Sequence, residues 1–147
     1  MREILFRGKV IESTVKEVGE WVYGHLVVRN VYDDEPEQCF ICEEGHKFMR
    51  CLNKMPCTYK VDPETVGQFT GLKDKKGKRI FEGDLVMFRS YTEPCEIAWD
   101  QEEARWFMKF SDCFIYFDDR CIPMDFEVIG NIHDNPELIA EVENAAD

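Results

Sequence analysis

Four cysteines in the first half of the chain have spacings that can suit a metal ion. Cys39 and Cys42 form a Cys-x2-Cys pair, Cys51 and Cys57 follow, and His46 lies between the pairs. Thiolate and imidazole ligands at short spacing can close a tetrahedral zinc site. The second pair is separated by five residues, however, and positions three apart on a strand point to opposite faces. We therefore expect buried, reduced thiols and no bound metal, with structural zinc as the open alternative.

The histidines and glycines do not form a recognisable catalytic or phosphate-binding pattern. The histidines stand far apart, without the HExxH spacing of a metalloprotease, and the glycines match neither GxGxxG nor GxxxxGK[ST]. We expect a hydrogen-bonded structural role for the histidines and turns at the glycines. The residues concerned are His25, His46, His133, Gly67, Gly71, Gly77 and Gly83.

Carboxylates are abundant near the C-terminal strands, where a pair could serve acid–base chemistry or bind a metal. A solvated acidic face explains them equally well, and Glu82 and Asp84 fit a tight turn whose side chains bond their own backbone. The sequence therefore assigns no catalytic, cofactor-binding or metal-binding residue, and we expect no cofactor. An enzyme with an unfamiliar site stays open. The remaining carboxylates considered are Asp118, Asp119, Asp125, Glu127 and Asp134.

Short β-strands separated by turn residues dominate the pattern along the chain. In the first half, strands are expected at 4–9, 19–28, 39–42, 48–52 and 58–61, in a meander-like order. Residues 73–78 form a polar turn in which Gly77 can adopt a positive φ. Further strands are expected at 85–88, 95–99, 105–110, 114–117 and 126–132, and a short acidic helix from Pro136 to Asn144 after Asn135.

The best-patterned stretch carries a family resemblance. Residues 65–86 contain Val-Gly-Gln-Phe-Thr-Gly-Leu-Lys-Asp and close on Ile-Phe-Glu-Gly-Asp-Leu-Val. This stretch closely resembles the signature of the YopX family of phage and prophage proteins, and residues 4–24 and 126–138 resemble the opening and the ending of that family. The resemblance implies a β architecture with an SH3-like barrel in its C-terminal part. It implies no biochemical function, so no catalytic residue is carried over.

Together, the resemblance and the strand pattern predict a mainly β protein in three parts. Residues 1–66 form an N-terminal β meander region, residues 67–133 a small SH3-like β-barrel domain, and residues 134–147 an acidic C-terminal helix and tail. At 147 residues and 44% hydrophobic composition, the chain can bury a core without disulfides or metal.

The charge distribution limits the possible partners. After residue 90 there are three basic and fifteen acidic residues, and the whole chain has a net charge of −12. Such acidity disfavours direct nucleic-acid binding, which needs Lys and Arg, and disfavours anionic membranes. The basic turn at 73–79 is either a solvated loop tip or a complement to the acidic segment of a neighbouring subunit.

The aromatic residues favour an interaction protein. Seven aromatics lie between residues 99 and 117, and strand alternation allows only about half of them to face one small core. We therefore expect a homo-oligomer, with a further protein partner that the sequence does not name. The function expected is a non-enzymatic protein-interaction or scaffold module. An acidic DNA-mimic decoy of a host nucleic-acid-binding protein is the alternative.

No apolar stretch approaches the ~20 residues of a membrane-spanning helix. The N-terminal residues 1–7 interrupt their apolar run with charges, unlike a signal peptide. These features predict a cytoplasmic protein that does not contact the membrane, and the resemblance to phage and prophage proteins implies that this is the cytoplasm of the host bacterium.

Overall fold

The computed structural model describes residues 3–30, 34, 36–45 and 57–139. The fold is mainly β, with 50% of residues in strands, a closed four-stranded barrel, additional strands and one short C-terminal helix. These features confirm the fold class expected from the sequence. Within the described residues, no helix has the length and apolar character needed to cross a membrane.

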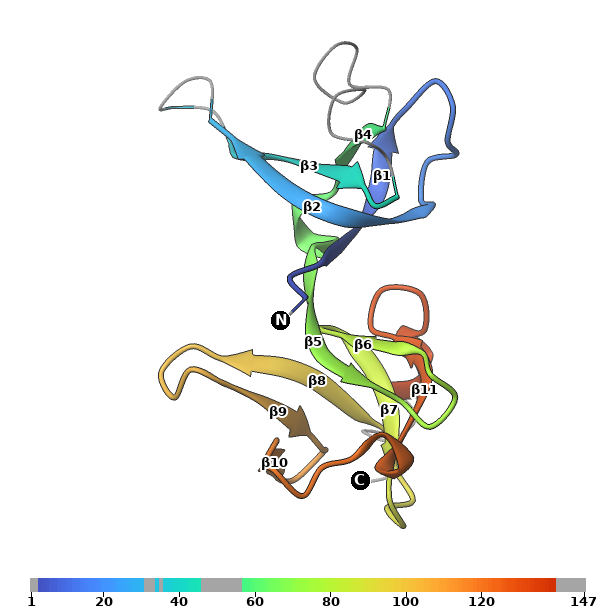
Figure 1. The fold of residues 1–147 in the computed structure, drawn as a ribbon, viewed down its shortest axis with the longest axis vertical. Helices are drawn as coiled ribbons and strands as arrows, with labels where there is room; N and C mark the ends of the chain where they lie inside the picture. Colours follow the sequence, from blue (N-terminus) through green and yellow to red (C-terminus); the bar gives the residue numbers. More distant parts are fainter. Residues whose placement is uncertain (1–2, 31–33, 35, 46–56, 140–147) are drawn as a thin grey trace. The chain divides into compact units, whose positions relative to one another are not determined.

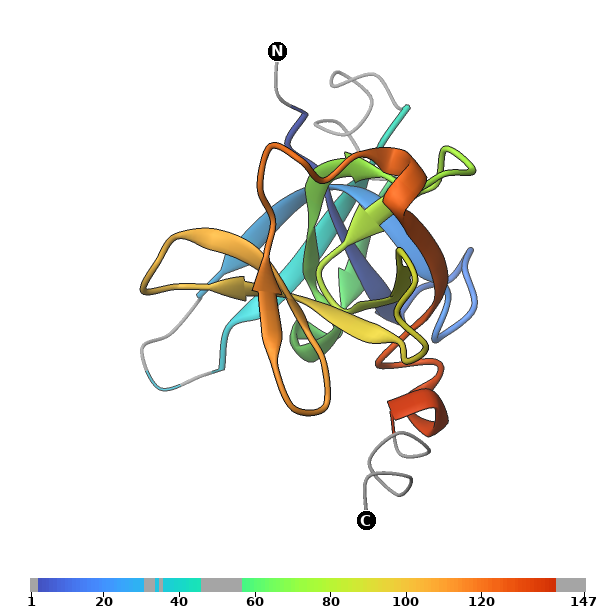
Figure 2. The same ribbon diagram turned by 90° about the horizontal axis from the view of Figure 1, so that it is seen from below.

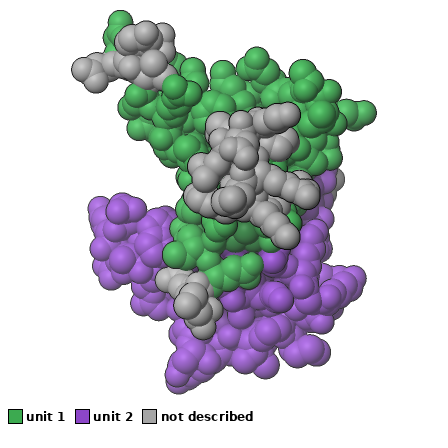
Figure 3. Space-filling model, turned by 45° about the horizontal axis from the view of Figure 1, so that its top comes forward, with its two compact units in different colours: residues 1–68 green, residues 69–147 purple. Residues whose placement is uncertain are grey.

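The chain divides into two compact units, residues 1–68 and residues 69–147, coloured green and purple in Figure 3. The division falls inside strand β5 (Gly67–Lys73), close to the turn at Asp62 and Pro63 that ends the preceding strand. Each unit has its own cluster of buried apolar side chains.

The first unit is an antiparallel meander that closes on itself (Figure 1, blue to green). Each strand pairs with the next one, and β1 also pairs with β4, where Val10 stands opposite Val61. The sequence indicated the meander, but closure depends on a pairing between distant residues. The strands are β1 (Phe6–Glu12), β2 (Trp21–Arg29), β3 (Gln38–Glu43) and β4 (Thr58–Val61).

Alternate side chains of these strands fill the barrel. The packed residues are almost completely removed from solvent, as expected for strands with one inward face. Gly24 of β2 lies against the backbone carbonyl of Cys42, and a Cβ there would overlap it, so only glycine fits this crossing. The core residues are Val10, Val22, Cys39, Ile41, Tyr59 and Val61.

Strand β5 begins after the 3-10 turn η1 (Pro63–Thr65) and pairs along two different stretches. Its first residues pair with β1, where Gln68 stands opposite Phe6. Its later residues pair with β6 (Arg79–Phe81), where Phe69 stands opposite Phe81. The register shifts between Phe69 and Lys73, at Gly71, whose φ of +90° suits glycine.

The second unit is built on a five-stranded antiparallel sheet in the order β10-β9-β8-β7-β11. The last strand pairs with the first, the others follow in sequence, and the 3-10 turn η2 precedes the last strand; this is the arrangement of SH3-like barrels. The helical turn at 136–139 follows Asn135, as expected (Figure 2, red). The elements are β7 (Asp84–Phe88), β8 (Cys95–Asp100), β9 (Arg105–Lys109), β10 (Phe114–Tyr116), η2 (Pro123–Asp125) and β11 (Phe126–Asn131).

Candidate interaction surface

The outer side of strands β8 to β10 carries aromatic side chains. Inward positions such as Ile97 and Met108 are fully buried in the core of the second unit. Because side chains alternate along a strand, the positions between them face outward. We call the outward cluster the aromatic face; its members are Asp100, Arg105, Phe107, Phe114 and Tyr116.

Three rings of the aromatic face contact one another edge to face. The Phe107 ring centroid lies 5.9 Å from that of Phe114 and 6.1 Å from that of Tyr116, and the last two are 5.3 Å apart. Such geometry suits the charge distribution of aromatic rings. Phe114 is nevertheless 58% exposed. The rings are therefore held in place by one another while one of them stays open to solvent.

Two charged residues fix one end of the aromatic face. The Tyr116 hydroxyl donates a hydrogen bond to the Asp100 carboxylate at 2.6 Å. The Arg105 guanidinium lies over the Tyr116 ring at 4.1 Å and donates to the Phe117 carbonyl at 3.0 Å. The hydrogen bond to Asp100 raises the pKa of Tyr116, and the same bond lowers the pKa of Asp100.

An open pocket of about 330 Å³ adjoins the same side of the sheet. Glu96 and Lys109 stand opposite each other in register on β8 and β9, and Lys109 is also opposite Phe114 of the aromatic face. The pocket walls are mostly apolar. Its lining residues are Pro94, Glu96, Lys109, Phe110, Ser111, Ile132 and Ile139.

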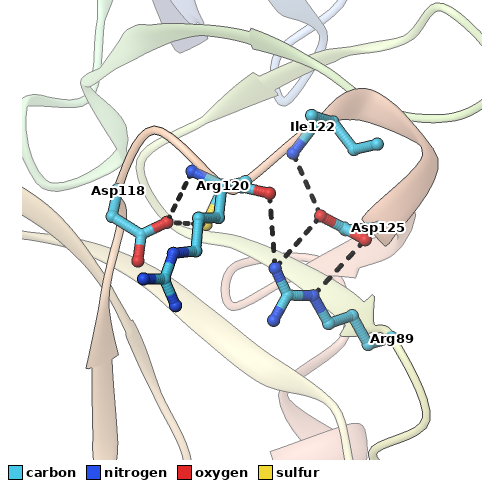
Figure 4. Close-up of polar contacts among 6 residues, drawn as sticks. Arg89, Asp118, Arg120, Ile122 and Asp125 are labelled. Carbon is cyan, nitrogen blue, oxygen red and sulfur yellow. Dashed lines mark hydrogen bonds and ion pairs between the residues drawn. The ribbon is translucent and has the colours of Figure 1, made fainter.

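Two of the acidic residues near the C-terminal strands, Asp118 and Asp125, hold parts of the chain together. Asp125 receives the Ile122 N–H at 3.0 Å and pairs with Arg89 at 3.4 Å (Figure 4). Arg89 has a φ of 49°, which is unusual for a residue with a side chain. The Ile122 hydrogen bond, followed by Arg89, lowers the pKa of Asp125. Asp118 accepts the Arg120 N–H at 2.8 Å, so both carboxylates stabilise the connection before β11.

The basic turn at 73–79 is also engaged within the chain. Lys75 and Lys76 each lie 3.1 Å from a carboxylate oxygen of Glu127 on β11. These two lysines lower the pKa of Glu127. The turn therefore has a partner inside the second unit, which weakens the expectation that it complements a neighbouring subunit.

The cysteines are only partly as expected from the sequence. Cys39 is buried in the barrel core, but Cys57 is disulfide-bonded, so the expectation of reduced thiols throughout is wrong for this residue. Its Sγ also lies 3.7 Å from that of Cys42, a contact between sulfur atoms that is not a disulfide bond.

The open alternative of a zinc site involves His46 as well as the four cysteines of the first half of the chain. Within the described parts of the chain, no group of three or more His, Cys, Asp or Glu side chains is arranged to hold a metal ion. Two members of the zinc alternative, His46 and Cys51, lie outside the described residues. His25 stands opposite Cys42 in the register of β2 and β3, and His133 lies in the turn after β11. In the second unit, burial raises the pKa of Cys95 to about 12.

A family model described as YopX protein matches residues 13–140, which is most of the chain. The chain belongs to the YopX family. A solved structure, the crystal structure of protein EF1440 from Enterococcus faecalis, is similar at 21% identity and a TM-score of 0.45, covering 95% of this chain and 99% of that one. No curated protein matches.

The polar residues of the YopX signature prove to be structural. Asp74 is 3% exposed, and its carboxylate accepts the N–H groups of Lys76, Lys78 and Val128 at 2.9, 2.8 and 3.0 Å. Burial raises the pKa of Asp74, but these three hydrogen bonds outweigh it, and the pKa lies below its usual value. Asp84 is also buried and accepts the Phe81 N–H at 2.7 Å.

The YopX-like ending is structural in the same way. Asn131 accepts the N–H groups of His133 and Asp134 through its side-chain oxygen at 3.0 and 2.9 Å. Asn135 in turn accepts the Asn131 N–H at 3.2 Å. These bonds shape the turn between β11 and the helical turn at 136–139. The family resemblance thus marks residues that hold the second unit together, while the aromatic face lies outside the recognisable motif.

Proposed function

We propose that this protein is a non-enzymatic protein-interaction module that binds its partner through the aromatic face. The observation that carries the proposal is the ordered ring cluster of Phe107, Phe114 and Tyr116, held by Asp100 and Arg105 on an outward side of the sheet. Exposed aromatic side chains with a polar rim are enriched in protein interfaces.

The bonding of four carboxylates in the second unit supports this proposal. Asp74, Asp84, Asp118 and Asp125 are occupied by backbone N–H groups or by an ion pair. The pocket beside the aromatic face has mostly apolar walls, and its one hydroxyl, on Ser111, donates to Glu93 at 2.9 Å. We therefore assign binding to this side of the sheet, and not chemistry.

The acidic DNA-mimic alternative has less support. It requires carboxylates that stand free along one face, whereas Asp74, Asp118, Asp125 and Glu127 are engaged inside the second unit. The resemblance to phage and prophage proteins supports a role inside the host bacterium, in its cytoplasm.

Affinity capture tests the proposed function with the full chain as bait. The lysate comes from a bacterium that carries a related prophage, and captured proteins are identified by mass spectrometry. We expect at least one protein to be lost with Phe107→Ser, which opens the ring cluster, and kept with Val18→Ser, which removes a 72% exposed side chain of the first unit. Circular dichroism confirms that both variants are folded. An identical set of captured proteins for all three baits would refute binding through this face.

A further inference from the structure

The five-stranded sheet of the second unit has two edge strands, β10 and β11, and their edges differ. At β11, the Val128 N–H donates to the Asp74 carboxylate at 3.0 Å and the Phe126 carbonyl accepts the Lys75 N–H at 3.0 Å. The turn between β5 and β6 thus takes up hydrogen-bonding groups of this edge. Covering an edge in this way is how natural proteins avoid unwanted strand pairing.

The other edge, β10, shows no such protection. The Phe117 N–H donates to the Trp106 carbonyl at 3.0 Å, and the Phe110 N–H donates to the Cys113 carbonyl at 2.8 Å. Because hydrogen-bonding direction alternates along an antiparallel strand, Ile115 also turns its backbone toward β9. Phe114 and Tyr116 therefore turn their backbone N–H and carbonyl groups outward, and no hydrogen bond of the described residues uses them.

The sequence of β10 lacks the usual obstacles to strand addition. Its three residues, Phe114, Ile115 and Tyr116, include no charged residue and no proline. The outward backbone groups belong to the same two residues that carry aromatic side chains of the aromatic face. A strand added here would gain main-chain hydrogen bonds and aromatic contacts together.

We propose that the occupant of this edge is a second copy of the chain, paired antiparallel through β10 about a two-fold axis at Ile115. This proposal rests on the proposed function and names a partner for the same face. In this register, Phe114 stands opposite the partner's Tyr116, and Tyr116 opposite the partner's Phe114. Each pair exchanges two backbone hydrogen bonds and sets an aromatic ring against another on the same face of the sheet. The edge is therefore self-complementary, as a two-fold interface requires.

The charges around the edge give this register a specific salt dependence. Asp112 and Asp118 flank β10, and the same pairing brings Asp112 near the partner's Asp118 at both ends. Lys75 and Lys76 are already paired with Glu127 within the chain. Because these lysines are already paired, they do not offset the repulsion between Asp112 and the partner's Asp118. Salt screens this repulsion, so we expect association to strengthen as salt is raised.

Sedimentation equilibrium of the full chain tests the proposal. We expect a mass twice the 17.3 kDa of one chain at tens of micromolar, tighter association at higher salt, and a dissociation constant raised at least about tenfold by Phe114→Lys. The control Asp112→Lys makes an even larger positive charge change in the adjacent turn and should leave association equal or stronger. A mass of one chain at all concentrations and salt conditions would overturn the proposal, as would a dimer that Phe114→Lys does not weaken.

Disulfide trapping tests the register directly, in a background of Cys113→Ser and Cys121→Ser. Ile115→Cys places two thiols opposite each other on the two-fold axis, at a separation that a disulfide accepts, whereas Phe114→Cys leaves them two positions out of register. We expect efficient cross-linking under a mild oxidant for Ile115→Cys alone. Equal cross-linking of both variants, or none in a chain that dimerises, would overturn the β10 register. A monomeric chain whose captured partner still depends on Phe107 would overturn this inference while leaving the proposed function intact.

Discussion

The edges at β11 and β10 belong to one sheet, but the chain covers the first and leaves the second open. β11 is covered by a buried carboxylate and a turn, through Asp74 and Lys75. β10 presents outward backbone groups at Phe114 and Tyr116, together with the exposed ring of Phe114. The covered edge coincides with the family signature and the uncovered edge does not. The difference indicates that the signature maintains the fold, and it is the basis of our proposal that β10 binds a partner.

The largest effect should come from uncovering the protected edge. Asp74→Ala leaves three backbone N–H groups without their acceptor in a site that is 3% exposed. We expect the free energy of unfolding to fall by about 3 kcal/mol, because a buried donor that loses a charged partner pays its full desolvation cost. Urea denaturation of Asp74→Ala against the exposed neighbour Lys73→Ala measures this. A loss no larger than that of the control would show that Asp74 does not hold the edge.

The same carboxylate predicts a pH dependence of stability. The pKa of Asp74 is lower in the folded chain than its unfolded value of about 3.9. The folded state therefore prefers the ionised group, and this stabilisation is fully present above the unfolded pKa and disappears as pH falls through the folded pKa. We expect the stability difference between the native chain and Asp74→Asn to be constant above about pH 5 and to shrink below about pH 4. A difference that does not change with pH would contradict the role of the charge.

The strands at both edges were predictable from local patterns. That the β11 edge is covered and the β10 edge is not was not predictable in this way. The alternation of 105–110 and 114–117 located β9 and β10 within two residues, and Gly77 adopts the positive φ expected of it, 81°. Asp74, however, reaches Val128, which is 54 residues away, and no periodicity reports such a contact. The alternation rule likewise showed that some aromatics must face outward, but the register was needed to identify Phe107, Phe114 and Tyr116.

The first unit shows the same limit of sequence reasoning. Its strands β1, β2 and β3 follow the expected meander, and Gly24 lies where the backbone of Cys42 approaches closely. Closure through Val10 and Val61 depends on distant parts of the chain. Long-range pairings of this kind decide whether a sheet has free edges, and local patterns do not encode them.

A smaller effect, a local loss of protection from hydrogen exchange, is expected in the segment 118–125 that connects β10 to β11. Asp125 accepts the Ile122 N–H and pairs with Arg89, which ties residues 118–125 to the end of β7. Asp125→Ala removes both contacts, so the Ile122 amide should exchange its hydrogen faster, measured by amide hydrogen exchange. Asp119→Ala, a nearby exposed carboxylate, is the matched control. Unchanged protection of Ile122 in Asp125→Ala would mean that the connection is held by other contacts.

The smallest effect is a titration at the uncovered edge itself. Tyr116 donates its hydroxyl to the Asp100 carboxylate, and this bond, together with burial and the negative charge, raises the pKa of Tyr116 above the usual tyrosine value of about 10. Asp100→Asn removes the charge, so the pKa of Tyr116 should move back toward that value. The ultraviolet absorbance of the phenolate follows the titration, in which Tyr116 should ionise at the highest pH. Loss of this high-pH step, the late transition, in Tyr116→Phe assigns it to Tyr116. Because Arg105 lies over the same ring and lowers the pKa, Arg105→Gln should move it further upward. If Asp100→Asn left the late transition unchanged, the hydrogen bond that fixes this end of the aromatic face would not form in solution.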